Sequence, residues 1–301
     1  MSETIPAAER RIRAILPVIR FMHAYLPLSL QRWLIEQGMA RVELPPDIRR
    51  EPASANGVRA EWLIPRDSPA DRALLYLHGG SFILGLTSLH LEMVAYLARK
   101  MGARALLVDY RLAPEHPFPA ALEDCVSAYR WLLQQGILAQ QVTMAGDSAG
   151  GNLTLTSLMK LRDDGQPLPA AAACLSPVAD LSGKRNRFRQ IHDPLLHPKS
   201  GRAARRSYVA DHQAHAPTIS PVYGEWRDLP PLLIHAGADE VLRYDARLVA
   251  ELAQAAGVDA RVEIYPRMWH VWQLFMTLPQ ALQSLDDIAR FLKAKLEPPA
   301  G

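Results

Sequence analysis

The chain has 301 residues, of which 49% are hydrophobic and 22% are charged, and it carries a formal net charge of +3. These proportions are ordinary for a globular protein with a large core, so the length fits either one α/β domain with an added lid or two domains. So small a net charge gives no argument for a nucleic-acid partner, and we expect none.

The two cysteines, Cys125 and Cys174, lie in apolar segments. They provide neither a disulfide framework nor a metal-binding spacing, so we expect buried thiols and no metal. Charged residues interrupt the apolar stretch that a signal peptide would need, namely Glu9, Arg10, Arg11, Arg13 and Arg20. No apolar run approaches the length of a membrane span, so the sequence predicts a cytoplasmic protein without stable membrane insertion.

Residues 1–50 form a basic, amphipathic segment that Pro17 and Pro27 are expected to break. Its apolar residues are Ile12, Ile15, Leu16, Ile19, Phe21, Leu26, Trp33, Leu34 and Ile35. We expect this segment to be an N-terminal cap whose apolar face packs on the core. The alternative is a helix that lies on a membrane surface, which we rank lower because a cap needs that same apolar face.

Short apolar runs alternate with helical patterns from Val58 onward, which is typical of a mostly parallel sheet covered by helices on both faces. The predicted strands are 58–64, 73–77, 103–109, 142–145, 170–175, 232–235 and 260–265. The predicted helices include 121–135, 244–256 and 281–296, each of which ends before a glycine or proline. These elements indicate one α/β domain over residues 51–301.

A polar segment rich in histidine and arginine, residues 180–218, interrupts this alternation. Ligands of α/β proteins bind at the carboxyl edge of the sheet, so we expect this insertion and the N-terminal segment to cover that edge as a cap. The basic clusters at 184–189 and 202–206 are expected to be a solvated cap surface. Attraction to anionic lipid or to an acidic partner is the alternative.

The pentapeptide Gly146–Gly150 lies between a predicted strand and the start of a helical pattern. Strand, G-x-S-x-G and helix in this order predict a nucleophile elbow, in which a tight, strained turn lifts the Ser148 hydroxyl clear of the sheet. A second motif, His78–Ser81, follows strand 73–77, where the oxyanion loop of such a fold is expected. The predicted oxyanion donors are the backbone N–H groups of Gly79, Gly80 and Ala149, and His78 is expected to brace the loop.

A serine hydroxyl reacts only when an oriented base removes its proton. In this fold the partners follow the serine in the order acid, then histidine. His270 comes directly after the last predicted strand and is the predicted base. Asp239 and Glu240, at the end of strand 232–235, both qualify as the acid that orients the imidazole, and Asp245 is a weaker third candidate.

Four motifs together resemble the hormone-sensitive lipase family of serine esterases: His78–Ser81, Asp109–Ala120, Gly146–Asn152 and Met268–His270. The resemblance implies an α/β-hydrolase fold, in which helices flank a mostly parallel sheet and a helical cap is added from the N-terminus and an insertion. It also implies hydrolysis of a small-molecule carboxylic ester through an acyl-serine, without a cofactor and usually with short acyl chains. The nucleophile, base and oxyanion donors assigned above agree with it.

Two positions depart from that family's pattern. The family commonly has Asp-Pro-Leu after a strand that opens with Leu-Pro-Pro, and counting forward from Leu229–Pro231 places Glu240 under that aspartate. Glu240 is therefore the first choice for the acid, with Asp239 as the alternative. Val271 and Trp272 stand where the family often has Gly-Phe, and we expect their bulk to narrow the substrate pocket.

Several alternatives stay open at this point. The same triad can serve amides as well as esters, so an amidase or an interfacial lipase is an alternative. A non-catalytic ligand receptor on this fold is disfavoured, because all three triad positions are filled. The natural substrate is not readable from the sequence, and a homodimer is compatible with it. Asp147 and the segment Tyr110–Pro119 are expected to be structural.

Overall fold

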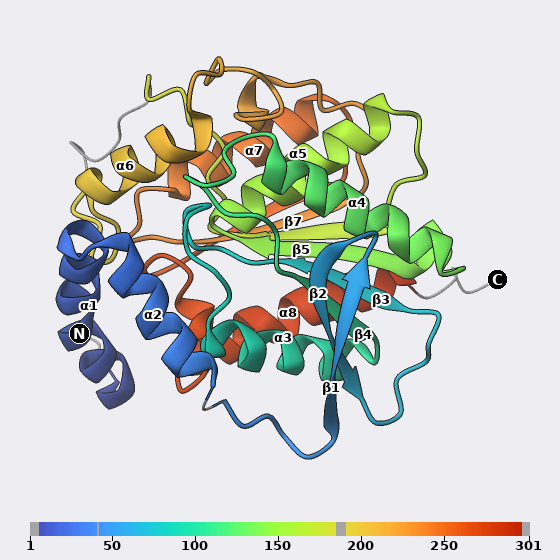
Figure 1. Cartoon of the computed structure of the whole chain (residues 1–301), viewed down its shortest axis with the longest axis horizontal. Coiled ribbons are helices and arrows are strands. Elements are labelled where there is room, and N and C mark those ends of the chain that lie inside the picture. Colours follow the sequence, from blue (N-terminus) through green and yellow to red (C-terminus); the bar gives the residue numbers. More distant parts are fainter. Residues whose placement is uncertain (1–5, 41, 185–190, 297–301) are drawn as a thin grey trace.

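The computed structural model describes residues 6–40, 42–184 and 191–296, and its strands form one eight-stranded sheet (Figure 1). In chain order the strands are β1 (Ile48–Ala55), β2 (Val58–Pro65), β3 (Ala73–Leu77), β4 (Arg104–Val108), β5 (Val142–Asp147), β6 (Ala171–Leu175), β7 (Leu232–Gly237) and β8 (Ala260–Tyr265). They lie side by side in the order β1-β2-β4-β3-β5-β6-β7-β8. The pairs β1–β2 and β2–β4 are antiparallel, and the other pairs are parallel.

Helices cover both faces of this sheet (Figure 1). One face carries α3 (Ser88–Met101) and α8 (Pro279–Leu296), and the other carries α4 (Ala120–Gln134), α5 (Ala149–Asp163) and α7 (Arg243–Ala255). The central strands from β4 to β7 are buried almost throughout. Because neither face of these strands meets water, their sequences are continuous apolar runs, which is why they are easy to recognise.

The structure confirms the predicted α/β fold and all seven predicted strands, whose ends shift by no more than two residues. Strand β1 was not predicted. It is one of the two outer strands of the sheet, and its sequence, Ile-Arg-Arg-Glu-Pro-Ala-Ser-Ala, contains four polar residues and Pro52. An edge strand tolerates proline because one side of its backbone needs no ladder hydrogen bonds, so no apolar run marks it.

Helix α1 (Ala7–Tyr25) continues through Pro17, so the predicted break at this residue is wrong. Pro17 lies on the exposed side of the helix, where water can bond the carbonyl that lost its N–H partner. Ile12 and Leu16 are buried in a cluster with Trp269 and Trp272, and this packing holds the helix. Pro27 separates α1 from α2 (Leu28–Met39), as predicted.

Only part of the N-terminal apolar set packs on the core. Ile15, Phe21, Trp33 and Leu34 are exposed, so the expectation that they pack inward is wrong. The two helices lie together with α6 (Pro198–Val209), which belongs to the 180–218 insertion, at one end of the molecule (Figure 1). Charged and polar contacts join these parts, one of which runs from Arg20 Nε to the Leu196 carbonyl oxygen at 3.1 Å.

Candidate active site

The turn between β5 and α5 has no room for a side chain at Gly146 or at Gly150, the two glycines that flank Asp147–Ala149. A Cβ atom at Gly146 would overlap the carbonyl oxygen of Gly150, and one at Gly150 would overlap the carbonyl oxygen of Leu77 on β3. Ser148 itself has φ 53° and ψ −113°, a conformation that costs a non-glycine residue of the order of 1–3 kcal/mol. The packed elements on either side hold this strained turn, and it presents the serine hydroxyl above the sheet.

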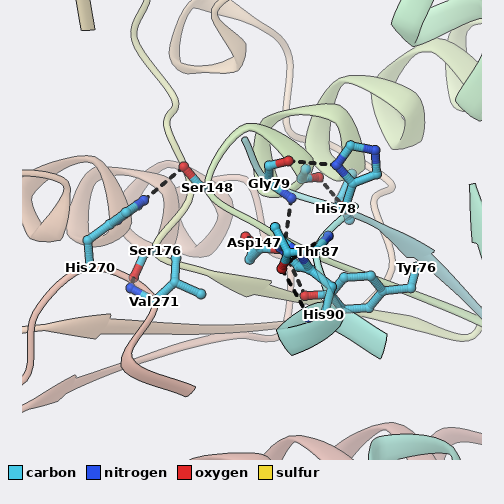
Figure 2. Close-up of polar contacts among 12 residues, drawn as sticks. Tyr76, His78, Gly79, Thr87, His90, Asp147, Ser148, Ser176, His270 and Val271 are labelled. Carbon is cyan, nitrogen blue, oxygen red and sulfur yellow. Dashed lines mark hydrogen bonds and ion pairs between the residues drawn. The ribbon is translucent and has the colours of Figure 1, made fainter. Parts of the chain in front are cut away.

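Ser148 and His270 lie within hydrogen-bond distance of each other (Figure 2). The distance from His270 Nε2 to Ser148 Oγ is 2.9 Å, and the distance from His270 Nδ1 to Glu240 Oε2 is 2.6 Å. A carboxylate can only accept, so Nδ1–H donates to Glu240 and the neutral ring keeps Nε2 free to accept from the serine. This is the hydrogen-bonding arrangement that a serine nucleophile needs.

Glu240, and not Asp239, lies against the imidazole. The Glu240 side chain is fully buried, and its Oε1 accepts hydrogen bonds from Ser176 Oγ and from the Gly237 N–H, each at 2.6 Å. The Asp239 side chain is 40% exposed and pairs with Arg13 at 2.8 Å. Asp245, the third candidate, accepts from the backbone N–H of Ala179 at 2.8 Å.

The ring of His270 is buried and only 5% exposed. Burial lowers the pKa of His270, but the hydrogen bond and the negative charge of Glu240, with Asp193 and Asp147 behind them, outweigh this effect and raise the pKa above its ordinary value. The site therefore stabilises the imidazolium that forms when the ring takes up a proton.

The sequence analysis missed two residues that support this arrangement. Ser176 accepts from the Val271 N–H at 3.2 Å (Figure 2). Its hydroxyl donates to Glu240, so Ser176 links the acid to the histidine loop. It follows β6 directly, and this place at the carboxyl edge could have revealed it. Asp193 is buried and accepts from the Val241 N–H at 2.9 Å. It lies in the polar insertion, where no pattern distinguishes it.

The loop after β3, which the sequence predicts to be the oxyanion loop, is braced from below by Asp147 (Figure 2). Asp147 Oδ1 accepts from the Gly79 N–H and from Tyr76 Oη, each at 2.9 Å, and Oδ2 lies 3.3 Å from His90 Nε2. The N–H of Gly79 is therefore used inside the protein, and the prediction that it donates to an oxyanion is wrong. A Cβ at Gly79 would also overlap the Asp147 carboxylate, which explains the glycine.

His78 braces the same loop, as predicted. Its ring stacks on Tyr110 with centroids 4.2 Å apart, and its Nδ1 lies 2.6 Å from the Gly79 carbonyl oxygen. Burial and the neighbouring His90 lower the pKa of His78 to about 4, which keeps the ring neutral. Gly80 and Ser81 continue the loop with φ values of 111° and 57°.

A cavity of about 270 Å³ opens beside the serine. Ser81, Ser148 and Ala149 line it, together with residues of the polar segment from Leu196 to Arg205. Val271 and Trp272 are buried and are not among the side chains that line it, so this cavity does not support the predicted narrowing by these residues. Trp272 is fully buried and packs on Tyr265, with ring centroids 4.9 Å apart.

Within the described residues, no group of three or more His, Cys, Asp or Glu side chains is placed to hold a metal ion. Over the same part of the chain, none of the helices combines the length and the apolar character needed to cross a bilayer.

Residues 74–274 match the model of a protein family that is described as having the alpha/beta hydrolase fold. An acetyl-hydrolase of Streptomyces hygroscopicus is 43% identical over 237 residues, which is 78% of this chain and 79% of that protein. The esterase LipU of Mycobacterium tuberculosis is 34% identical over 295 residues, or 93% of this chain and 98% of that protein. A solved esterase from the bacterial hormone-sensitive lipase family superposes with a TM-score of 0.91 at 37% identity, covering 98% of this chain and 100% of that chain.

Because Asp147 braces the loop after β3, Asp147→Asn should destabilise the protein much more than Asp239→Asn does. Burial alone would raise the pKa of Asp147, but His90 and the hydrogen bonds from Tyr76 and Gly79 lower it, so the carboxylate is charged. Asp147→Asn should therefore lower the free energy of unfolding by about 2 kcal/mol or more, because an amide places a donor among donors. Asp239→Asn removes a partly buried ion pair with Arg13 at the edge of the protein and should cost about 1 kcal/mol or less. Urea denaturation compares them, and equal losses would contradict the bracing role.

Proposed function

This chain belongs to the hormone-sensitive lipase family of α/β-hydrolase esterases, and we propose that it cleaves short-chain carboxylic esters through an acyl-serine on Ser148. Hydrolysis of carboxylic esters follows from the family and from the esterases among its relatives. One observation supports the proposed route most strongly: two hydrogen bonds join Ser148, His270 and Glu240 in a line beside the cavity.

In the first step, His270 Nε2 accepts the proton of Ser148 Oγ as that oxygen bonds to the carbonyl carbon of the ester. Glu240 holds the ring and stabilises the imidazolium. The tetrahedral intermediate collapses by breaking the bond to the alcohol oxygen, which receives the proton from His270. A water molecule then attacks the acyl-serine with His270 again as base, and the carboxylic acid leaves as Ser148 regains its proton.

The oxyanion of each tetrahedral intermediate needs N–H donors that are not already hydrogen-bonded to another group of the protein. We propose the backbone N–H groups of Gly80, Ser81 and Ala149, with Ser81 taking the role that the sequence analysis assigned to Gly79. The support is that Asp147 engages the Gly79 N–H, while Ser81 and Ala149 line the cavity together with Ser148. Loss of one such donor typically costs about 10²–10³ in rate.

The volume and the lining of the cavity favour small substrates. Its volume of about 270 Å³ is below the range of roughly 300–1,000 Å³ for pockets that enclose drug-sized ligands. Apolar side chains of the lining, among them Phe82, Val178 and Leu196, fit a short acyl or alcohol group. Amide hydrolysis and action on long-chain lipid at an interface remain the alternatives, and a receptor without catalysis is disfavoured by the complete triad.

We also propose that residues 1–50 and the insertion 180–218 are the cap of a catalytic domain that spans residues 51–301. The position of α1, α2 and α6 at one end of the molecule supports this division (Figure 1). A cytoplasmic location and the absence of a nucleic-acid partner stay predictions from the sequence, and a homodimer is still open.

A panel of p-nitrophenyl esters with increasing acyl length tests the proposed function. The kcat/KM value should be highest for the shortest acyl chains, and Ser148→Ala should lower kcat by roughly 10⁴-fold or more without unfolding the chain. Circular dichroism checks the fold of the variant. A variant that keeps the wild-type rate, activity confined to emulsified long-chain ester, or a wild-type protein that cleaves only amides would contradict the proposal.

The assignment of the triad acid is tested by the pair Glu240→Gln and Asp239→Asn. The amide that Glu240→Gln introduces cannot hold the correct tautomer of His270 or stabilise its charged form, so kcat should fall by about 10³–10⁴-fold. Asp239→Asn should stay within a few-fold of wild type, because this side chain points to Arg13. If the Asp239 substitution alone abolished turnover, Glu240 would not be the acid.

Activity should fall on acidification, because only the neutral imidazole can accept the serine proton. Glu240 raises the pKa of His270 above 6.5, so kcat/KM should lose half of its plateau value at a pH above 6.5. A pH profile on a soluble, uncharged ester measures this midpoint. A midpoint well below 6.5 would contradict the raised pKa of His270. A profile that stays flat down to acidic pH would contradict its role as the base.

A further inference from the structure

The N-terminal helices expose most of the large hydrophobic side chains found on the described surface. We call Ile15, Val18, Phe21 and Tyr25 of α1, with Leu30, Trp33 and Leu34 of α2, the N-terminal apolar face. Each is at least 39% exposed, and Val18 and Phe21 reach 58%. Outside these helices, the described residues expose only Leu138 and Tyr223 among side chains of this kind. Such a concentration of exposed apolar residues usually marks a binding surface.

Helix α1 is apolar on two sides, and only one of them has a partner in the fold. Ile12 and Leu16 point into the cluster around Trp269, whereas Ile15 and Val18 face outward. The rings of Phe21 and Tyr25 stack with centroids 4.9 Å apart and are both more than half exposed. The outward side is therefore an ordered apolar surface, and it is not needed for packing the cap on the core.

The surroundings of this face are positively charged. No Asp or Glu occurs between Arg10 and Ile35 or in residues 194–210. The first stretch contains five arginines, of which Arg13 and Arg32 pair with carboxylates from outside it. Helix α6 adjoins α1 and exposes Lys199, Arg202 and Arg206. Lys199 Nζ lies 4.2 Å from the centre of the Tyr25 ring, so the basic groups and the apolar face are directly continuous.

We propose that the N-terminal apolar face, with the basic side of α6, docks the protein on a lipid surface that carries anionic headgroups. Helices that lie in the interface combine Trp, Phe and Leu on one side with Lys and Arg beside them, which is the composition observed here. Basic groups close to such a surface are attracted by its negative potential. A second copy of the chain fits less well, because a two-fold contact would bring the two α6 helices, with their like charges, together.

The proposed orientation places the cavity at the lipid surface. His197 lines the cavity, and its ring lies 5.6 Å from the ring of Tyr25 on the docking face. An ester dissolved in the lipid would then have a short path to Ser148. This consequence rests on the proposed esterase function, whereas the docking itself does not depend on catalysis.

Sedimentation with lipid vesicles tests the docking, using the full chain with Ser148→Ala so that ester hydrolysis plays no part. Vesicles of phosphatidylcholine mixed with phosphatidylglycerol should bind the protein, and binding should weaken on replacement by pure phosphatidylcholine or on addition of salt. Phe21→Ser with Trp33→Ser should lower the partition coefficient by roughly ten-fold or more. Leu138→Ser with Tyr223→Ser, the same kind of change at other exposed sites, should change it by less than about two-fold.

A charge variant, Lys199→Glu with Arg206→Glu, keeps the apolar face intact and should reduce only the binding that depends on phosphatidylglycerol. Circular dichroism of all variants checks that they fold. Absence of binding to the mixed vesicles, equal losses for the two serine pairs, or no effect of the charge variant would overturn the proposal. So would self-association of the chain that the Phe21 and Trp33 substitutions abolish, since a second copy would then be the occupant.

Discussion

The close approach of β3, β5 and α5 at Ser148 is the constraint on which the rest of the structure depends. No side chain fits at Gly146 or Gly150, and the serine is held in a conformation that costs energy. That cost is met by the buried sheet and helix on either side of the turn. Because β6 and β7 end at the same edge as β5, the chain brings Ser176 and Glu240 to the serine, and the loop after β8 completes the site with His270.

Two buried carboxylates near the serine have different tasks, and their surroundings set the difference. Asp147 is surrounded by donors from β3, the oxyanion loop and α3, so its charge fixes the backbone of the loop. Glu240 directs one oxygen to Ser176 and Gly237 and the other to His270. Asp147 thus orders the loop at which the negative charge of the oxyanion is proposed to develop, and Glu240 stabilises the positive charge on the His270 ring. The hydrogen bonds from Tyr76, Gly79 and His90 favour the charged form of Asp147.

Local patterns in the sequence predicted most of the fold and the order of the site residues. Buried parallel strands are continuous apolar runs, which made them easy to predict. The local pattern left Asp239 and Glu240 both open, and the resemblance to the family's Asp-Pro-Leu motif, counted from Leu229–Pro231, was needed to prefer Glu240. The predictions that were wrong concern the direction in which a group points and the contacts between residues that lie far apart in the sequence. Whether the Gly79 N–H points to an oxyanion or to Asp147 depends on the packing of two strands, which no pattern within one loop encodes. The same holds for α1, since periodicity shows that it is apolar but not which of its sides the core covers.

The central claim is that Ser148 is the nucleophile and that the turn which holds it makes it uniquely reactive. Labelling of the folded chain with a fluorophosphonate, followed by mass spectrometry of its peptides, tests this claim directly. The account predicts one adduct, on the peptide that contains Ser148, and much slower labelling when His270 is replaced by glutamine. An adduct on a different residue, or no adduct on properly folded protein, would contradict it.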